Sequence, residues 1–330
     1  MVKGFERKII MNTAVEYYDI GALLYCPANN PGIADSIINE RFGTHFSLAL
    51  CLEDTINDAC VAEAENQLVL TINKIFSERF KKPFYVPKIF IRVRNVSQIS
   101  DLLNRFGSSK ELIKGFILPK FRLHNADEYI NTISDINGNS NQKIYMLPIL
   151  ESADIVNLQN RYSILYQIKE KLSSIEELVL NIRVGGNDLC HLFGFRRNDT
   201  QSIHQIKPIS GIFSDIVTVF GMDYVISGPV WEYYSSSNWE NGLKNELADD
   251  RLCGFIGKTV IHPKQIPIIN NAYQVSQKDF DDAKSILNWD ISSNSFVSGS
   301  VAKERMNEYK THSNWAFRTM MLAEAFGIRS

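Results

Sequence analysis

The sequence contains little cysteine, and its cysteines form no pattern typical of a metal site or a disulfide framework. Only five occur in 330 residues, and no two are spaced as Cys-x-x-Cys: Cys26, Cys51, Cys60, Cys190 and Cys253. Cys190 precedes His191, but no second pair at zinc spacing accompanies it. We therefore expect reduced thiols that fill small spaces in the core, as is usual in a cytoplasmic protein.

The sequence also lacks a charge excess and a long apolar run. Its 35 Lys and Arg against 37 Asp and Glu give a net charge of −2, whereas nucleic-acid and anionic-membrane binding favour a basic surface. No segment approaches the roughly 18 apolar residues of a membrane helix. Residues 1–19 mix acids with bases and lack the apolar core of a secretory signal. We expect a cytoplasmic globular protein without nucleic-acid or membrane partners.

Short, nearly continuous apolar runs recur along the chain and predict parallel strands covered on both faces. There are eight, at residues 22–28, 47–54, 88–95, 115–120, 143–151, 178–188, 223–230 and 257–262. Amphipathic stretches between them, such as 58–80, 97–107 and 161–172, predict helices. Strands alternating with helices indicate an α/β fold built from βαβ units.

The number and spacing of these units favour a TIM (β/α)8 barrel. They run from residue 22 to residue 262, close to the about 250 residues typical of that fold. We therefore predict a barrel domain at 1–275 and a C-terminal helical arm at 276–330. A doubly wound open sheet is the alternative, but no glycine-rich phosphate turn follows the first strand, as that fold would favour.

The arm is predicted to contain two helices. Residues 276–289 begin with Ser276 as an N-cap, followed by acids in the first turn. A Ser-rich linker at 291–300 precedes a second helix at 301–327, which carries large apolar residues, among them Trp315. Such a helix should pack on the barrel or on a neighbouring subunit.

Polar residues stand where the apolar strands end. They are Glu53, Asp54, Arg92, Asn95, Lys120, Glu151, Asn187, Asp188 and His262. One strand-terminal charge is usually the solvated start of a loop. In a barrel, however, the carboxyl ends of all strands meet on one face, where barrel enzymes place their chemistry. The repetition therefore predicts a functional site there.

The residues themselves suggest the chemistry of that site. Glu151 and Asp188 are one barrel unit apart, so their carboxylates could share a hard cation, Mg²⁺ or alternatively Mn²⁺. Arg92 offers a planar fork for a carboxylate. The segment VGGND (184–188) gives backbone flexibility beside Asp188 and is as typical of a tight turn as of a binding loop. Gly186 and Asn187 in this segment are candidate substrate-binding residues.

Six motifs in order carry a family resemblance: LCLEDTI (50–56), IFIRV (89–93), ILPK (117–120), PILES (148–152), RVGGNDL (183–189) and GFIGKTVIHPKQI (254–266). Together they resemble the citrate lyase β-subunit-like members of the HpcH/HpaI aldolase superfamily. The branch that the chain most resembles is the C–C bond lyase-like one associated with tellurite-resistance-type stress gene clusters. The resemblance extends from about residue 22 to residue 276.

The resemblance implies a barrel that uses Mg²⁺ to make or break carbon–carbon bonds through an enolate. It implies that Glu151 and Asp188 are the metal ligands. It places Arg92 on the substrate's carboxylate or carbonyl group, and Glu53 and Asp54 around water that binds the metal. The remaining matched residue, Lys120 of the LPK motif, is expected to act structurally or electrostatically rather than as a nucleophile.

The resemblance also concerns the tail. In acyl-CoA lyases of this family an acidic tail residue can reach a neighbouring subunit's site. The segment KERMNE (303–308) places Glu308 at that position, as a candidate base; a solvated helix face is the alternative, and His312 is a second candidate. A homo-oligomer, a homotrimer or a multiple of it, is implied.

Some positions depart from the family or stay ambiguous. Asn30 stands where the family commonly has an arginine, and asparagine binds but does not neutralise an anion, which counts against a standard acyl-CoA substrate. Trp231, Tyr233 and Tyr234 either shape a pocket or cap the barrel. His262, before a proline, is more typical of a loop-fixing histidine than of a metal ligand.

These observations predict a Mg²⁺-dependent carbon–carbon lyase or aldolase that acts on a small carboxylated substrate, with a CoA thioester as one candidate. The alternatives are a catalytically altered barrel that serves as a scaffold in a stress-response assembly, and phosphoenolpyruvate-type enolate chemistry.

Overall fold

Eight parallel strands form the centre of the protein. The computed structural model describes residues 15–329, so part of the N-terminal stretch analysed for a secretory signal lies outside the described residues. The strands are β1 (Ala22–Pro27), β2 (Ser47–Cys51), β3 (Lys88–Arg92), β4 (Ile113–Leu118), β5 (Tyr145–Leu150), β6 (Ile182–Val184), β7 (Ile226–Ser227) and β8 (Lys258–Val260). They pair in chain order from β1 to β7, and β8 pairs with β1. A bridge between Gly228 and Lys258 brings the last two strands together. The predicted barrel is confirmed, and the open sheet is excluded.

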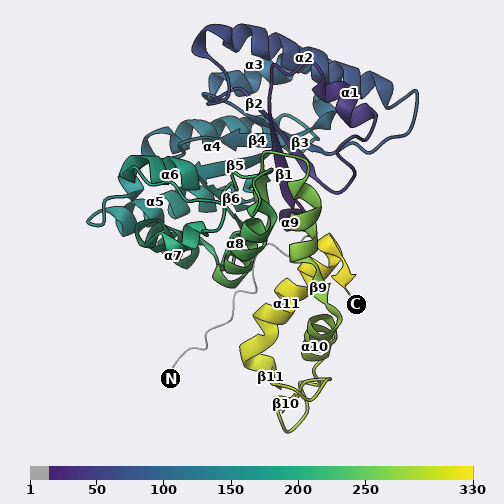
Figure 1. The fold of residues 1–330 in the computed structure, drawn as a ribbon, viewed down its shortest axis with the longest axis vertical. Coiled ribbons are helices and arrows are strands. Elements are labelled where there is room, and N and C mark those ends of the chain that lie inside the picture. Colours follow the sequence, from purple (N-terminus) through teal and green to yellow (C-terminus); the bar gives the residue numbers. More distant parts are fainter. Residues whose placement is uncertain (1–14, 330) are drawn as a thin grey trace.

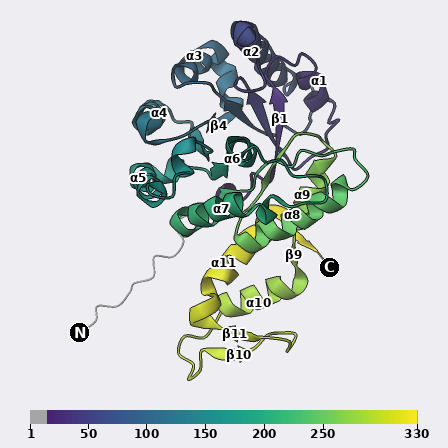
Figure 2. The ribbon, with the colours of Figure 1, turned by 60° about the vertical axis from the view of Figure 1, so that its left-hand side comes forward.

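Helices surround these strands (Figures 1 and 2). They are α1 (Ile33–Ile38), α2 (Val61–Glu78), α3 (Ser97–Phe106), α4 (Leu123–Gly138), α5 (Arg161–Ser173), α6 (Gly186–Phe193), α7 (Lys207–Phe220), α8 (Trp239–Cys253) and α9 (Gln265–Tyr273), with a short 3-10 helix η1 at Val15–Tyr17. The predicted helices at 97–107 and 161–172 agree with α3 and α5 to within a residue at either end. None of the described helices is long and apolar enough to cross a membrane.

The sixth strand is shorter than the sequence predicts. Of the apolar run at 178–188, Ile182–Val184 forms the regular strand, and Val179 adds a single bridge to Met146 of β5. Gly185 and Gly186 end the strand by turning the chain into α6. Asp188 therefore lies in the first turn of a helix and not at a strand end. The glycine pair that sequence analysis treated as flexible is thus a strand-to-helix turn.

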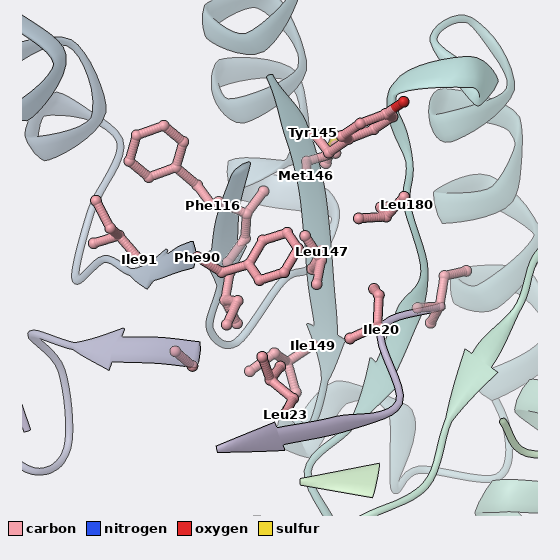
Figure 3. Close-up of a cluster of buried hydrophobic side chains, with 14 of the residues drawn as sticks. Ile20, Leu23, Phe90, Ile91, Phe116, Tyr145, Met146, Leu147, Ile149 and Leu180 are labelled. Carbon is pink, nitrogen blue, oxygen red and sulfur yellow. The ribbon is translucent and has the colours of Figure 1, made fainter. Parts of the chain in front are cut away.

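The inside of the barrel is apolar toward its middle. Leu23, Phe90, Leu147 and Ile149 come from three different strands and lie within the space that the strands enclose (Figure 3). All four are at most 5% exposed. Burying a side chain of this size stabilises the fold by about 1.5–3 kcal/mol. Because side chains alternate along a strand, the next inward positions toward the carboxyl ends can carry polar groups.

The first helix of the C-terminal arm begins where it was predicted, and the second begins later. Helix α10 (Gln277–Leu287) begins as predicted, with the Ser276 side chain accepting a hydrogen bond from the Asp279 N–H. The second helix, α11 (Tyr309–Phe326), starts eight residues later than the predicted residue 301. Residues before it form a hairpin of β10 (Val297–Gly299) and β11 (Met306–Glu308).

A local turn explains the late start of α11. The Ser300 side chain accepts hydrogen bonds from the N–H groups of Glu304 and Arg305, and Lys303 has a left-handed backbone with φ of 59°. These features favour a turn over a helix at this point. The end of the predicted linker and the start of the predicted helix therefore form the connection between β10 and β11.

The arm packs against the amino-terminal end of the barrel. Phe326 lies beside Gly21, just before β1, and the Arg318 side chain donates to the Gly254 carbonyl in the turn that precedes β8. The last strand, β12 (Ile328–Arg329), pairs with β9 (Val275–Ser276). In Figures 1 and 2 the hairpin end of the arm extends away from the barrel.

The cysteines are free, as expected, but they do not all fill the core. Three are buried: Cys26, Cys51 and Cys190. Cys60 is partly buried, and Cys253 is exposed because it ends α8 on its solvent side, so the prediction was wrong for Cys253.

Candidate active site at the carboxyl ends of the strands

The loop after β2 carries Glu53 and Asp54 and is held by an arginine that sequence analysis did not single out. Arg94 donates from Nε to the Leu52 carbonyl at 2.7 Å and from Nη2 to the Ile56 carbonyl at 2.6 Å. Because these bonds cross the loop, they fix the direction in which its two carboxylates point.

These two carboxylates form an ionic cluster with two cations from the neighbouring strands. The Arg92 Nη2 atom lies 2.8 Å from Glu53 and 3.1 Å from Asp54. The Lys120 Nζ atom lies 2.7 Å from Glu53 and 3.3 Å from Asp54. Arg92 also reaches the Glu151 Oε1 atom at 3.4 Å. The structure thus brings five of the predicted residues together.

Glu151 is the most buried acid of this group, with 4% of its surface exposed. Burial raises its pKa to about 8; Arg92 opposes this effect and the Asp188 charge adds to it. The Oε1 atom accepts a hydrogen bond from the Lys120 backbone N–H at 2.9 Å. Asp188 is therefore close enough to Glu151 for their charges to interact, as the metal-site prediction requires.

The other acids respond differently to the same cations. Burial raises the pKa of Glu53, while the pKa of Asp54 is lowered because its contacts with Glu53, Arg92 and Lys120 outweigh burial. Against the effect of burial, the Glu53 and Asp54 carboxylates raise the pKa of Lys120 to about 12. At neutral pH this raised pKa favours the charged ammonium form of Lys120.

Lys120 contributes through its backbone as well. Its φ of 48° places it in the left-handed region, which is uncommon for a residue with a side chain. The Asn125 side chain bonds both sides of this turn, donating to the Lys120 carbonyl and accepting from the Arg122 N–H. The turn aims the Lys120 N–H at Glu151 and the ammonium at Glu53 (2.9 and 2.7 Å).

The residues present fit a hard divalent cation. Glu151 and Asp188 supply carboxylate oxygens, the ligands that Mg²⁺ prefers, and Mg²⁺ usually keeps several waters beside one or two carboxylates. Gly185 leaves room for the Glu151 carboxylate: a Cβ there would lie 2.9 Å from Glu151 Cδ and closer still to Oε2. In the part of the chain that the structure describes, no three His, Cys, Asp or Glu side chains form a metal cluster, so the fit rests on the Glu151 and Asp188 carboxylates.

The predicted substrate-binding residues occupy different settings. The exposed Asn30 is engaged in its own turn, donating to Cys26 Sγ at 3.4 Å and accepting from the Gly32 N–H at 3.0 Å. Gly186 is buried, and a Cβ there would lie 2.6 Å from Ile203, which indicates a packing constraint. Asn187 lines a cavity of about 300 Å³ together with residues such as Glu232.

Glu308 lies far along the chain from this group, at the end of β11. Its N–H donates to His312 Nδ1 at 3.0 Å, so both candidate tail residues belong to the N-terminal turn of α11. The arm docks at the opposite end of the barrel from Glu151, and Glu308 therefore does not join the site of its own chain.

The aromatic residues after β7 and the histidine after β8 pack against one another. Trp231 is completely buried, and Tyr233 donates to the Arg197 carbonyl. Tyr234 stacks on His262 with ring centroids 4.7 Å apart, and His262 accepts from the Lys264 N–H. Trp231 packs against Gly242 of α8 and lies under the Arg197 guanidinium, and the His262 side chain is bonded within its own loop.

Two polar groups escaped the sequence analysis. Inside the barrel, Arg183 donates to the Thr259 hydroxyl at 2.7 Å. Outside β8, the fully buried Lys258 bonds Glu246 at 2.9 Å and Asp250 at 2.6 Å, both on α8. Arg183 and Lys258 lie within two of the motifs that carry the family resemblance. No local pattern, however, reveals which face of a three-residue strand a side chain occupies.

A cavity of about 840 Å³ lies elsewhere. It is lined by residues that precede or begin β1, β2 and β3, by residues of α9, and by Phe326 of the arm. It therefore belongs to the amino-terminal end of the barrel, away from the ionic cluster.

The chain is similar to known proteins in sequence and in fold. The model of the family "C–C bond lyase of the TIM-barrel fold" matches residues 14–328. The β-subunit of citrate lyase from Haemophilus influenzae is 41% identical over 54 residues, which are 16% of this chain and 19% of that protein. The Escherichia coli K12 counterpart is 39% identical over 54 residues, 16% of this chain and 18% of its own length. The chain thus matches about a fifth of the length of these relatives.

Among solved structures, CitE from Mycobacterium tuberculosis, in complex with magnesium, acetoacetate and coenzyme A, has a TM-score of 0.58. It is 18% identical, with 94% of this chain and 99% of that chain covered. RipC from Yersinia pestis has a TM-score of 0.51 at 14% identity, over 78% of this chain and 95% of its own. At these identities the likeness is one of fold.

Proposed function

The chain belongs to the C–C bond lyase family of the TIM-barrel fold, and we propose that it cleaves or forms a carbon–carbon bond next to a carbonyl group of a small carboxylated substrate. Glu151 and Asp188 would hold Mg²⁺, with Mn²⁺ as an alternative. When bound, the cation supplies a Lewis acid for the negative charge that develops on a carbonyl oxygen. The observation that carries the proposal is the buried Glu151 carboxylate, set between the Arg92 guanidinium and the Asp188 charge.

Residues of the chain itself would supply the remaining electrostatic stabilisation. Arg92 and Lys120 keep positive charge beside the developing oxyanion, and their ion pairs with Glu53 and Asp54 hold both in place before substrate arrives. Such preorganised charge is usually the largest contribution to catalysis. This is consistent with an electrostatic and not a nucleophilic role for Lys120, given its raised pKa of about 12.

A proton must leave the hydroxyl group that becomes a carbonyl in the cleavage direction. Glu53 is the candidate within this chain, because burial raises its pKa and it lies 8% exposed at the edge of the cluster. Glu308 could take this role only from a second copy, since the arm of each chain packs at the far end of its own barrel. We propose a homotrimer, or a multiple of it, as the assembly in which that contact forms.

A CoA thioester is a candidate substrate because CitE from M. tuberculosis was solved with coenzyme A and acetoacetate. Asn30 counts against it, because an asparagine held within its own turn cannot neutralise an anionic group. The same observation supports a second candidate function, an altered barrel that acts as a scaffold in a stress-response assembly. We further propose that the protein acts in the cytoplasm.

Calorimetric titration with MgCl2 tests the proposal. We expect Glu151→Gln and Asp188→Asn to abolish saturable Mg²⁺ binding, and Glu63→Gln, an exposed acid on α2, to leave it unchanged. Metal-dependent cleavage of oxaloacetate, malyl-CoA or citramalyl-CoA would exclude the scaffold function. Equal Mg²⁺ affinity in all three variants would remove the basis for the metal site.

A further inference from the structure

A second arginine lies inside the barrel, one layer below Glu151. Arg183 sits on β6 in register with Ile149 of β5 and Ser227 of β7. Ile149 is among the inner side chains of Figure 3. Arg183 also bonds Thr259 of β8 and lies near Tyr25 of β1, strands that β6 can reach only across the barrel interior. Its guanidinium therefore points inward.

Arg183 differs from Arg92 in its lack of acidic partners. Arg92 has three carboxylates within 3.4 Å. Arg183 forms no ion pair among the residues that the structure describes, although only 2% of its surface is exposed. Its Nη1 atom is buried and has no hydrogen-bond partner in the described chain, and the same holds for the Ser227 hydroxyl in register with it.

A buried cation without a counter-charge is costly, because desolvation is not offset by attraction. Burial, together with the positive charge of Arg92, accordingly lowers the pKa of Arg183, and the Tyr25 hydroxyl only partly compensates. A sequence would not be expected to retain such a residue for stability alone. An anionic ligand that is present during function would supply the missing charge.

The surroundings are suited to such a ligand. Tyr25 and Thr259 both border Arg183 and keep part of their surface accessible, so this layer is not sealed from solvent. Two donors lack partners in the described chain, Arg183 Nη1 and the Ser227 hydroxyl. They come from neighbouring strands at the same register, and both are groups that can donate to a carboxylate. Neither residue belongs to the ionic cluster around Glu53.

We propose that Arg183 binds the carboxylate of the substrate inside the barrel, and that the substrate is a compact 2-oxo or hydroxy acid that enters with this carboxylate first. The assignment rests on the proposed lyase function for the identity of the ligand. It transfers the carboxylate-binding role from Arg92, whose guanidinium is already ion-paired with Glu53, Asp54 and Glu151, to Arg183. The carbonyl group would then lie above it, beside Glu151 and Asp188.

Pyruvate binding tests the proposal, measured by calorimetry with and without MgCl2. We expect Arg183→Met to weaken pyruvate binding at least about tenfold, and Arg183→Lys to fall between it and the wild type, because lysine keeps the charge but not the fork. Hydroxyacetone, which has the carbonyl group but no carboxylate, should bind wild type and Arg183→Met equally.

The melting temperature separates a ligand-binding role from a structural one. Removing an unneutralised buried charge should leave the melting temperature of Arg183→Met unchanged or higher. The matched control is Arg161→Met, since Arg161 is also buried but bonds Asp215 and two backbone carbonyls. Arg161→Met should melt lower and, where folded, bind pyruvate like the wild type.

Three results would overturn the proposal: no saturable pyruvate binding to the wild type, unchanged affinity in Arg183→Met, or a fall in its melting temperature comparable with that of Arg161→Met. Arg183-dependent binding in both buffers without any Mg²⁺ binding would contradict the metal site of the proposed function and still support this inference.

Discussion

Replacing Gly185 with alanine would test the geometry of the metal site by adding a single methyl group. Gly185 has φ of −89° and ψ of 75°, values that residues with a side chain can adopt, so the backbone tolerates the change. The added Cβ, however, would lie 2.9 Å from Glu151 Cδ and closer to its Cβ and Oε2 atoms. Glu151 cannot move freely, because its Oε1 atom is bonded to the Lys120 N–H.

The expected cost follows from this collision. Overpacking of a tight site typically costs about 1–3 kcal/mol, so the free energy of unfolding of Gly185→Ala should fall by this amount. The Glu151 carboxylate would be displaced, and disturbing the orientation of a metal ligand typically lowers metal affinity by about 10–100-fold. The loss should therefore be visible both in the urea midpoint and in Mg²⁺ titration.

Gly211→Ala is the matched control. Gly211 lies within α7, and a Cβ there meets nothing within 4 Å. Replacing an interior helix glycine with alanine should stabilise the protein by roughly 0.5–1 kcal/mol. The two alanine variants should thus move the urea midpoint in opposite directions. If Gly185→Ala were as stable as Gly211→Ala and bound Mg²⁺ like the wild type, the proposed placement of Glu151 over Gly185 would be refuted.

Three further predictions concern the turn at Lys120, the Arg94 side chain and the buried Asp250. Lys120→Gly should keep the fold, because glycine accepts the left-handed backbone at this position. Lys120→Val should lower the free energy of unfolding, measured by urea titration, by about 1–3 kcal/mol. Equal stability of the two variants would contradict the role of the turn. Arg94→Ala removes the bonds to the Leu52 and Ile56 carbonyls, so hydrogen exchange should speed up at 52–58, and unchanged exchange would argue against the anchor. Burial raises the pKa of Asp250, but Lys258 and His204 outweigh burial, so the pKa in the folded protein is lower than in the unfolded chain. The ionised Asp250 therefore stabilises the fold fully above the unfolded pKa of about 3.9, and this stabilisation is lost as the pH falls through the pKa of the folded protein. Asp250→Asn should melt lower at pH 7 and show a flatter fall of melting temperature below pH 5 than the wild type, and an identical pH profile would refute the coupling.

The order of the fold could be predicted because each βα unit leaves a local trace. A buried parallel strand needs a continuous apolar run, and eight such runs at regular spacing leave few alternatives to a barrel. The ends of elements were harder, because they depend on single side-chain contacts. The Ser300 turn that delays α11 and the Gly185–Gly186 turn that shortens the sixth strand are both of this kind.

The site was predictable only where residues follow strands directly. Glu53, Asp54, Lys120 and Glu151 follow their strands closely, and Arg92 is the last residue of its own. They meet because all parallel strands end on one face. Arg183 lies within an apolar run, and its importance comes from what it lacks, a carboxylate partner. That absence is a long-range property that involves β1, β7 and β8 together, and no spacing in the sequence encodes it.

The two arginines give the proposed site a direction. Three carboxylates face the Arg92 guanidinium and the Lys120 ammonium. Because burial raises the pKa of Glu151 to about 8, the ionic cluster carries one net negative charge only when Glu151 loses its proton, as metal binding would require. The inner layer at Arg183 has a positive charge with no acidic partner in the described chain. A cation is therefore drawn to the Glu151 layer and an anion to the layer beneath it. A 2-oxo acid has a carboxylate next to its carbonyl group, so it can satisfy both layers at once, whereas a molecule with a neutral end in place of the carboxylate would leave Arg183 unpaired. The electrostatics of the barrel thus favour one orientation of substrate, with the bond to be broken pointing toward the open face and Glu53.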